Sequence, residues 1–182
     1  MFFGWGRRSK NLIECPLCQQ SNNAEEIKGS NFEYIQLIEY VENTDLSVDK
    51  NFEFVQEQID IKQYIIYKLS NIYFNNTDWP GNNIKFWKHP DTKWRWIMFD
   101  TDFGFGPFWN VDNYWENTLY FALDGNGDGW PNPEWSTLLF ERLITNDNFK
   151  NDFINRYADE LNSRFLPSNV VEHIDNIYSK VQ

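Results

Sequence analysis

Two short apolar segments, each bordered on its outer side by a run rich in Asn and Asp, restrict the fold most. Residues 84–88 and 94–99 are rich in aromatic and β-branched side chains, and the five residues between them include Pro and Asp, which form turns. This pattern predicts a β-hairpin. Because antiparallel pairing sets the start of one strand beside the end of the other, the polar runs at 75–83 and 99–106 should meet.

Apolar side chains recur at helical spacing through most of the remaining chain. Two helix starts carry capping signals, because Ser30 lies three residues before Glu33 and Asp60 lies three residues before Gln63. We expect an α+β domain over 30–182 that is mainly helical, preceded by an arm without regular structure. The predicted helices run from 30 to a polar linker at 43–50, over 52–58, 60–72, 134–145 and 149–165, and from 168 to the end.

The two polar runs contain the residue types of a phosphate-transfer site. Asp78 and Asn83 are five positions apart, the spacing of the catalytic Asp and a metal-binding Asn in protein-kinase catalytic loops. Residues 102–104 read Asp-Phe-Gly, the metal-binding tripeptide of kinases. Asn and Asp also form turns readily, so either run alone is compatible with a simple turn. Their order and spacing together favour phosphate transfer.

A longer pattern around these motifs resembles one family. Residues 73–87, centred on Asn-Asn-Thr-Asp-Trp-Pro-Gly-Asn-Asn, and residues 93–106, centred on Phe-Asp-Thr-Asp-Phe-Gly, are similar to the spore coat protein H (CotH) kinase family. The resemblance implies an atypical protein-kinase-like fold, of which this chain matches the C-terminal lobe, with the hairpin carrying the active site. It also implies Mg²⁺-dependent transfer of phosphate from ATP to Ser or Thr of a protein.

The resemblance also assigns roles to individual residues. Asp78 corresponds to the catalytic Asp and Asn83 to a metal ligand. Either Asp100 or Asp102 corresponds to the second metal ligand, and the sequence does not choose between them. An aromatic residue ahead of this Asp-x-Asp motif is expected to stack on the adenine, and the candidates are Trp94 and Trp96.

The chain departs from the family pattern in its upstream part. Kinases hold the ATP phosphates with a Gly-rich loop and a paired Lys, and no Gly-rich loop precedes Asp78. We therefore expect an incomplete kinase-like domain that binds nucleotide weakly, and a catalytically inactive kinase-like fragment is an alternative. The family is associated with spore coats and with extracellular or cell-surface locations, whereas no signal peptide is recognisable at 1–10. The oligomeric state stays open.

The charge and composition of the chain restrict the classes of molecule that it is expected to bind. The net charge of −11 at pH 7, with no basic stripe, argues against nucleic acid and anionic membranes and favours a basic protein substrate or a bound cation. No segment has the length and apolarity of a membrane span.

Aromatic residues make up 19% of the chain, which favours either a core or a ligand surface. The second reading leads to an alternative function, a carbohydrate- or calcium-binding module in which Trp79, Trp94 and Trp109 stack on sugar rings. Residues 124–129 begin like an EF-hand loop, but the twelfth position is Trp135, so a turn is favoured. Cys15 and Cys18 lack a second pair of zinc ligands.

Overall fold

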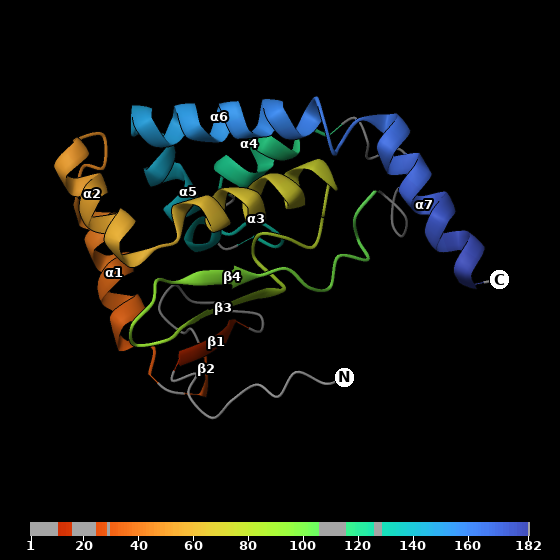
Figure 1. The fold of residues 1–182 in the computed structure, drawn as a ribbon. Helices are drawn as coiled ribbons and strands as arrows, with labels where there is room; N and C mark the ends of the chain where they lie inside the picture. Colours follow the sequence, from red (N-terminus) through yellow and green to blue (C-terminus); the bar gives the residue numbers. More distant parts are fainter. Residues whose placement is uncertain (1–10, 16–24, 29, 106–115, 126–128, 182) are drawn as a thin grey trace.

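The computed structural model of the chain describes residues 11–15, 25–28, 30–105, 116–125 and 129–181 (Figure 1). Within these ranges the protein has an α+β fold with seven helices and one small antiparallel sheet. The strands are β1 (Asn11–Cys15), β2 (Glu25–Lys28), β3 (Ile84–Lys88) and β4 (Arg95–Ile97). The helices are α1 (Phe32–Asn43), α2 (Asp49–Gln58), α3 (Ile61–Tyr73), α4 (Thr118–Leu123), α5 (Glu134–Ile144), α6 (Asp147–Leu161) and α7 (Pro167–Val181).

The sheet has the strand order β2-β1-β3-β4, and each neighbouring pair is antiparallel. The predicted hairpin is confirmed, because β3 pairs with β4 in a register that sets Phe86 opposite Trp96. The segment 1–29, predicted to be an irregular arm, contains β1 and β2, and β1 pairs along the whole of β3. Neither strand was expected, because four or five residues of mixed polarity carry little periodic signal.

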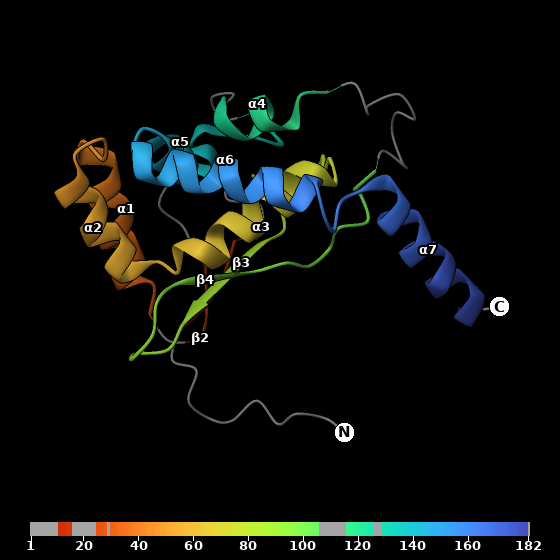
Figure 2. The ribbon, with the colours of Figure 1, turned by 45° about the horizontal axis from the view of Figure 1, so that its top comes forward.

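Helix α3 lies at the centre of the fold, between β4 on one side and the helices α4 and α6 on the other (Figures 1 and 2). The predicted helices are found with boundaries shifted by a few residues, which is usual at helix ends. Helix α4 was not predicted, because six residues are too few to show helical periodicity.

Two helix starts show how the predicted capping signals are used. The Asp60 side chain accepts a hydrogen bond from the backbone N–H of Gln63 at 3.2 Å and caps α3 as predicted. At the start of α1 the Asn31 side chain makes no capping bond, and the Ser30 hydroxyl accepts the backbone N–H of Phe32 at 3.2 Å instead of that of Glu33. In place of the predicted capping box with Ser30, the Glu33 carboxylate pairs with Lys88 Nζ at 2.8 Å, and so joins α1 to β3.

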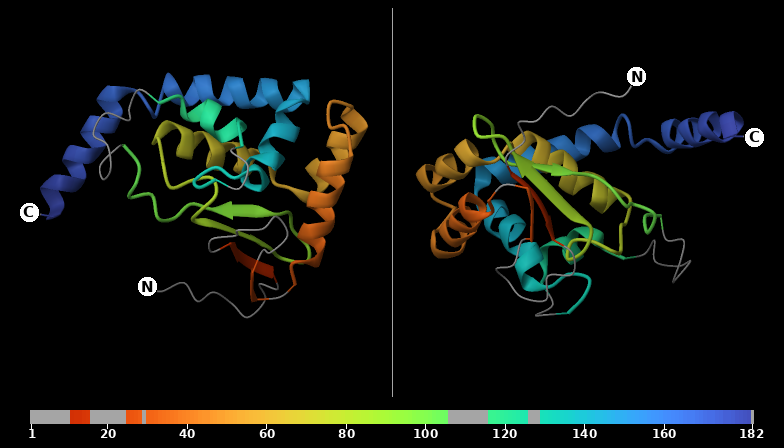
Figure 3. Two further views of the ribbon diagram at one scale, coloured as in Figure 1. Left: turned by 180° about the vertical axis from the view of Figure 1, so that it is seen from behind. Right: turned by 90° about the horizontal axis from the view of Figure 1, so that it is seen from below.

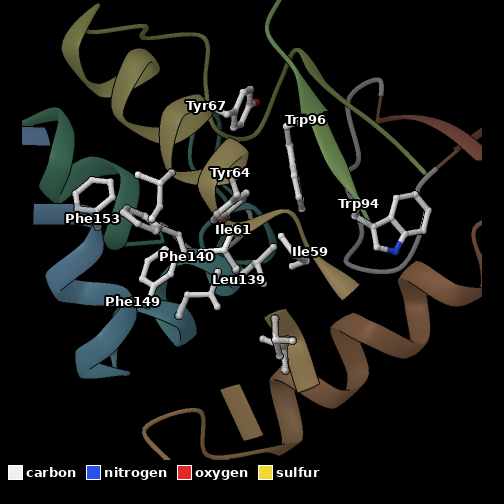
Figure 4. Close-up of a cluster of buried hydrophobic side chains, with 14 of the residues drawn as sticks. Ile59, Ile61, Tyr64, Tyr67, Trp94, Trp96, Leu139, Phe140, Phe149 and Phe153 are labelled. Carbon is white, nitrogen blue, oxygen red and sulfur yellow. The ribbon is translucent and has the colours of Figure 1, made fainter. Parts of the chain in front are cut away.

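Aromatic rings form a large part of the core (Figure 4). The ring of Trp96 packs edge-on against Tyr64 of α3, with the ring centroids 4.6 Å apart. Trp94 contacts the rings of Tyr34 and Phe86 at 5.4 and 5.7 Å. Much of the high aromatic content therefore fills the space between α3, the sheet and the helices α5 and α6.

The start of α3 is bonded directly to the start of β4. Trp94 N–H donates to the Gln58 carbonyl at 2.8 Å, and Asp60 N–H donates to the Trp94 carbonyl at 3.0 Å. Arg95 adds a charged hydrogen bond to the Asp60 carboxylate at 2.6 Å. These contacts fix the helix that leads to Asp78 against the strand that leads to the Asp-x-Asp motif.

Helix α7 extends away from the rest of the molecule (Figures 1 and 3). None of its side chains is buried, and one of its faces carries exposed apolar residues such as Ile174 and Ile177. No described helix is both long and apolar enough to cross a lipid bilayer.

Candidate functional site

The loop between α3 and β3, residues 74–83, carries Asp78 and is bonded to α3 by its side chains. Asn76 Nδ2 donates to Asn71 Oδ1 at 3.0 Å, and Asn76 Oδ1 accepts the backbone N–H of Asp78 at 3.3 Å. The indole N–H of Trp79 donates to the Tyr67 hydroxyl at 3.0 Å. Residues on both sides of Asp78 are thus anchored in the core, which fixes the position of its carboxylate.

Asp78 is only 9% exposed, and its carboxylate accepts hydrogen bonds from three side chains of the described part of the chain. Asn82 Nδ2 lies 3.0 Å from both carboxylate oxygens. Asn83 Nδ2 donates to Oδ2 at 2.7 Å, and the indole N–H of Trp130 donates to Oδ1 at 3.2 Å. The donors hold the carboxylate in one orientation and compensate its charge in a largely buried position.

Two of these donors were not predicted. Asn82 belongs to the predicted polar run, but its role depends on the way the loop turns back on Asp78. Trp130 is 52 residues from Asp78 in sequence, and nothing local marks it. Of the two, only Asn82 could have been found from the sequence, because it directly precedes Asn83 in the Asn-Asn pair of the motif.

The segment that carries Trp130 is packed tightly against the Asp78 loop. Gly81 N–H donates to the Pro131 carbonyl at 2.6 Å. A Cβ atom at Gly81 would lie 2.6 Å from that same oxygen and would overlap Pro133 as well. Only glycine permits this close approach, so the sequence Pro-Gly in the loop has a packing reason.

The Asp-x-Asp motif brings two further carboxylates to the site. Asp100 and Asp102 are exposed and hydrogen-bonded to each other, and Asp100 lies within range of the charge of Asp78. Loss of solvent, the charge and hydrogen bond of Asp102 and the charge of Asp78 all raise the pKa of Asp100, whereas the charge of Lys85 acts in the opposite direction. Negative charge therefore accumulates at this end of the hairpin.

Asn83 lies at the same end of the hairpin because it is the residue before β3. Within β3, Lys85 pairs with Ile97, three residues before Asp100. Asn83 is also bonded to Asp78, and the charge of Asp78 reaches Asp100 of the Asp-x-Asp motif. Carboxylate and amide oxygens are the ligands that Mg²⁺ takes, and a divalent cation here would offset the repulsion among the carboxylates. Among the described residues, no group of three or more His, Cys, Asp and Glu side chains is arranged to hold a metal ion.

The residues that follow the Asp-x-Asp motif lie against the end of α3. Phe105 N–H donates to the Phe74 carbonyl at 2.5 Å, and the two rings are 5.3 Å apart. A Cβ atom at Gly104 would lie 3.3 Å from that carbonyl oxygen. Helix α4 is attached nearby, because Thr118 Oγ1 donates to Asn75 Oδ1 at 2.7 Å. Both flanks of the site therefore rest on the residues at the end of α3.

The two tryptophans predicted to contact adenine lie in the core (Figure 4). Trp94 is fully buried, and Trp96 is 6% exposed. Other aromatic side chains pack against both rings, edge-on or tilted. The role in adenine stacking stays a prediction. Trp79, assigned to sugar stacking in the alternative function, is 1% exposed.

Several further predictions fall wholly or partly outside the described residues. They concern Trp109 in the carbohydrate-binding alternative, Cys18 in the cysteine pair, and the centre of the EF-hand-like run at 126–128.

A family model described as CotH kinase protein matches residues 11–182. This match confirms the resemblance based on residues 73–87 and 93–106, and it extends upstream to include β1 and β2. Neither a curated protein nor a solved structure matches the chain.

Proposed function

The chain belongs to the CotH kinase family, and we propose that it transfers phosphate from ATP to a Ser or Thr hydroxyl of a protein in a Mg²⁺-dependent reaction. One observation carries the proposal. A largely buried Asp78 carboxylate, oriented by three N–H donors, lies beside the Asp-x-Asp motif at the open end of the hairpin. Family membership supports a kinase-like function, and this geometry supports the specific roles.

Asp78 acts on the acceptor in this proposal. Its carboxylate orients the hydroxyl and accepts its proton as the oxygen attacks the γ-phosphorus, and the bond from phosphorus to the ADP oxygen breaks. Asn83 and one of Asp100 and Asp102 hold Mg²⁺, which neutralises charge on the phosphates when bound. Because Asn83 Nδ2 donates to Asp78, the amide oxygen would be the atom that binds the cation.

The acceptor is a protein with a basic surface. The chain has a net charge of −11, and the site itself concentrates carboxylates near Asp100. Such a surface attracts cationic partners and repels nucleic acid.

The test is phosphate incorporation into a basic, Ser-rich protein at millimolar ATP and varied Mg²⁺. Asp78→Asn is expected to reduce transfer at least about a hundredfold, within the range of a general acid–base group. Asp100→Asn and Asp102→Asn should raise the Mg²⁺ concentration needed, and the larger effect identifies the metal ligand. Asp91→Asn is the matched control, because Asp91 is exposed in the hairpin turn.

Thermal melts of each variant separate chemistry from folding. Both oxygens of Asp78 accept N–H groups. In Asp78→Asn an NH₂ group replaces one of these oxygens and meets an N–H donor, so some loss of stability is expected. If Asp78→Asn melts at a much lower temperature but retains full transfer when folded, Asp78 is a structural residue and the proposed mechanism is wrong.

A further inference from the structure

Side chains of the described residues occupy both carboxylate oxygens of Asp78. A carboxylate offers about four lone-pair positions. In the described part of the chain, Oδ1 is contacted by Asn82 and Trp130, and Oδ2 by Asn82 and Asn83. An acceptor hydroxyl that passes its proton to Asp78 must lie within hydrogen-bond distance of one of these oxygens. One of the present donors must therefore leave when the acceptor binds.

The two asparagines are poorly suited to leave. They follow Asp78 by four and five residues in the same loop, and their contacts of 2.7 to 3.0 Å are part of the turn that shapes it. Asn83 also leads directly into β3. Displacing either amide would distort the loop that carries the catalytic carboxylate.

Trp130 differs from the two asparagines in the length of its contact and in its place in the chain. Its N–H lies 3.2 Å from Oδ1, the longest of the four contacts, and its side chain belongs to a separate segment. The residue is 56% exposed, so its ring can rotate into solvent. The backbone of its segment stays in place, because the Pro131 carbonyl is bonded to Gly81 N–H.

Resting on the proposed function, we infer that Trp130 occupies the acceptor position: its indole N–H fills the site on Asp78 Oδ1 that the substrate Ser or Thr hydroxyl takes over. Trp130 is thus a specificity-determining residue. It keeps water away from the catalytic oxygen until an acceptor protein displaces the ring. In its absence water would attack the γ-phosphorus, the bond to the ADP oxygen would break, and the water proton would pass to Asp78 and then to solvent.

The kinetic test uses Trp130→Phe, which retains an aromatic ring and removes the N–H donor. We expect the KM for a basic Ser-rich acceptor protein to fall at least threefold, because the acceptor no longer competes with the indole. Hydrolysis of ATP without acceptor should rise at least threefold. Trp87→Phe, the same change on β3, is the control and should change neither quantity, because the donors to the Asp78 carboxylate in the described part of the chain are Asn82, Asn83 and Trp130. An unchanged KM with unchanged hydrolysis overturns the inference, and so does a fall in kcat alone.

A spectroscopic test does not depend on activity. The indole N–H signals of the nine tryptophans are recorded by ¹H–¹⁵N NMR, and the one absent from Trp130→Phe is assigned to Trp130. This signal should shift on Asp78→Asn and move towards the position of a solvent-exposed indole when the acceptor protein and Mg²⁺ with a non-hydrolysable ATP analogue are added. A signal that stays in place while the acceptor binds overturns the inference even if phosphate transfer is normal. If the protein transfers no phosphate, the proposed function fails, and a Trp130 signal that still moves supports the displacement separately.

Discussion

At the scale of single residues, Asn and Asp serve this site both through their backbones and through their side chains. Asn75, Asn83 and Asp100 have positive φ angles of 51°, 55° and 52°. Asn and Asp tolerate this left-handed conformation better than other residues with a Cβ. Asn83 and Asp100 are also proposed metal ligands. The turn-forming and the ligand interpretations of the polar runs are therefore compatible.

Asn83→Gly separates the two contributions, because glycine keeps the left-handed backbone and removes only the amide. We expect transfer to fall at least about tenfold and the required Mg²⁺ concentration to rise. Asn83→Ala should show the same catalytic loss with an additional loss of about 1 kcal/mol in stability from backbone strain. Activity against Mg²⁺ concentration and urea unfolding measure the two effects. Full activity in Asn83→Gly would show that the amide serves only the turn.

At the scale of elements, one side chain joins α3 to β4. Gln63 Nε2 donates to the Trp96 carbonyl at 2.7 Å, and Gln63 Oε1 accepts the Trp96 N–H at 2.9 Å. Its amide therefore pairs with both backbone groups of one residue, as a neighbouring strand would. Because β4 is an edge strand, this contact covers part of an otherwise open edge.

Gln63→Ala should destabilise the fold by about 2 kcal/mol, because both backbone groups of the largely buried Trp96 lose their partner. The control is Lys62→Ala, the neighbouring exposed position on the same helix, which should change stability by less than about 0.5 kcal/mol. The free energy of unfolding in urea gives both values. Equal effects of the two substitutions would mean that the Gln63 contact contributes nothing to stability.

The same elements show how far the sequence predicts this fold. The hairpin, the Asp60 cap and most helices follow from local periodicity and turn chemistry, and the loop around Asp78 follows from motif spacing. The contacts of Trp130 with Asp78 and of Glu33 with Lys88 could not be predicted in this way, because they join residues that are 52 and 55 positions apart in the sequence. Local patterns do not encode such pairings. The burial of Trp94 and Trp96 likewise depends on the packing of α3 against β4.

At the scale of the whole molecule, the folded core contains an ionisable amine, that of Lys68. Lys68 is 3% exposed, and its amine lies 4.6, 5.2 and 5.5 Å from the ring centres of Trp79, Phe140 and Tyr64. Burial lowers the pKa of Lys68 to about 7 from its ordinary value of 10.5, and Glu141 acts in the opposite direction. The aromatic faces also favour the charged amine.

Stability should therefore depend on pH through this group. Between about pH 7 and 10.5 the unfolded chain binds a proton that the folded protein lacks, so the contribution of Lys68 to stability rises with pH across this window. Lys68→Met should be more stable than the natural chain at pH 7 and below, with a difference that shrinks by at most about 1.4 kcal/mol per pH unit above it. Unfolding free energies at several pH values test this, with exposed Lys62→Met as the control. A difference that does not vary with pH would contradict it.

The backbone bonds that join residues 58–60 to Trp94 also determine how the folded protein can open. The helix that leads to Asp78 and the strand that leads to Asp100 begin at this one junction. A fluctuation that detaches β4 must break the same bonds that hold the start of α3, and the reverse is also true. The two halves of the site therefore belong to one cooperative unit, and they are lost together instead of in stages.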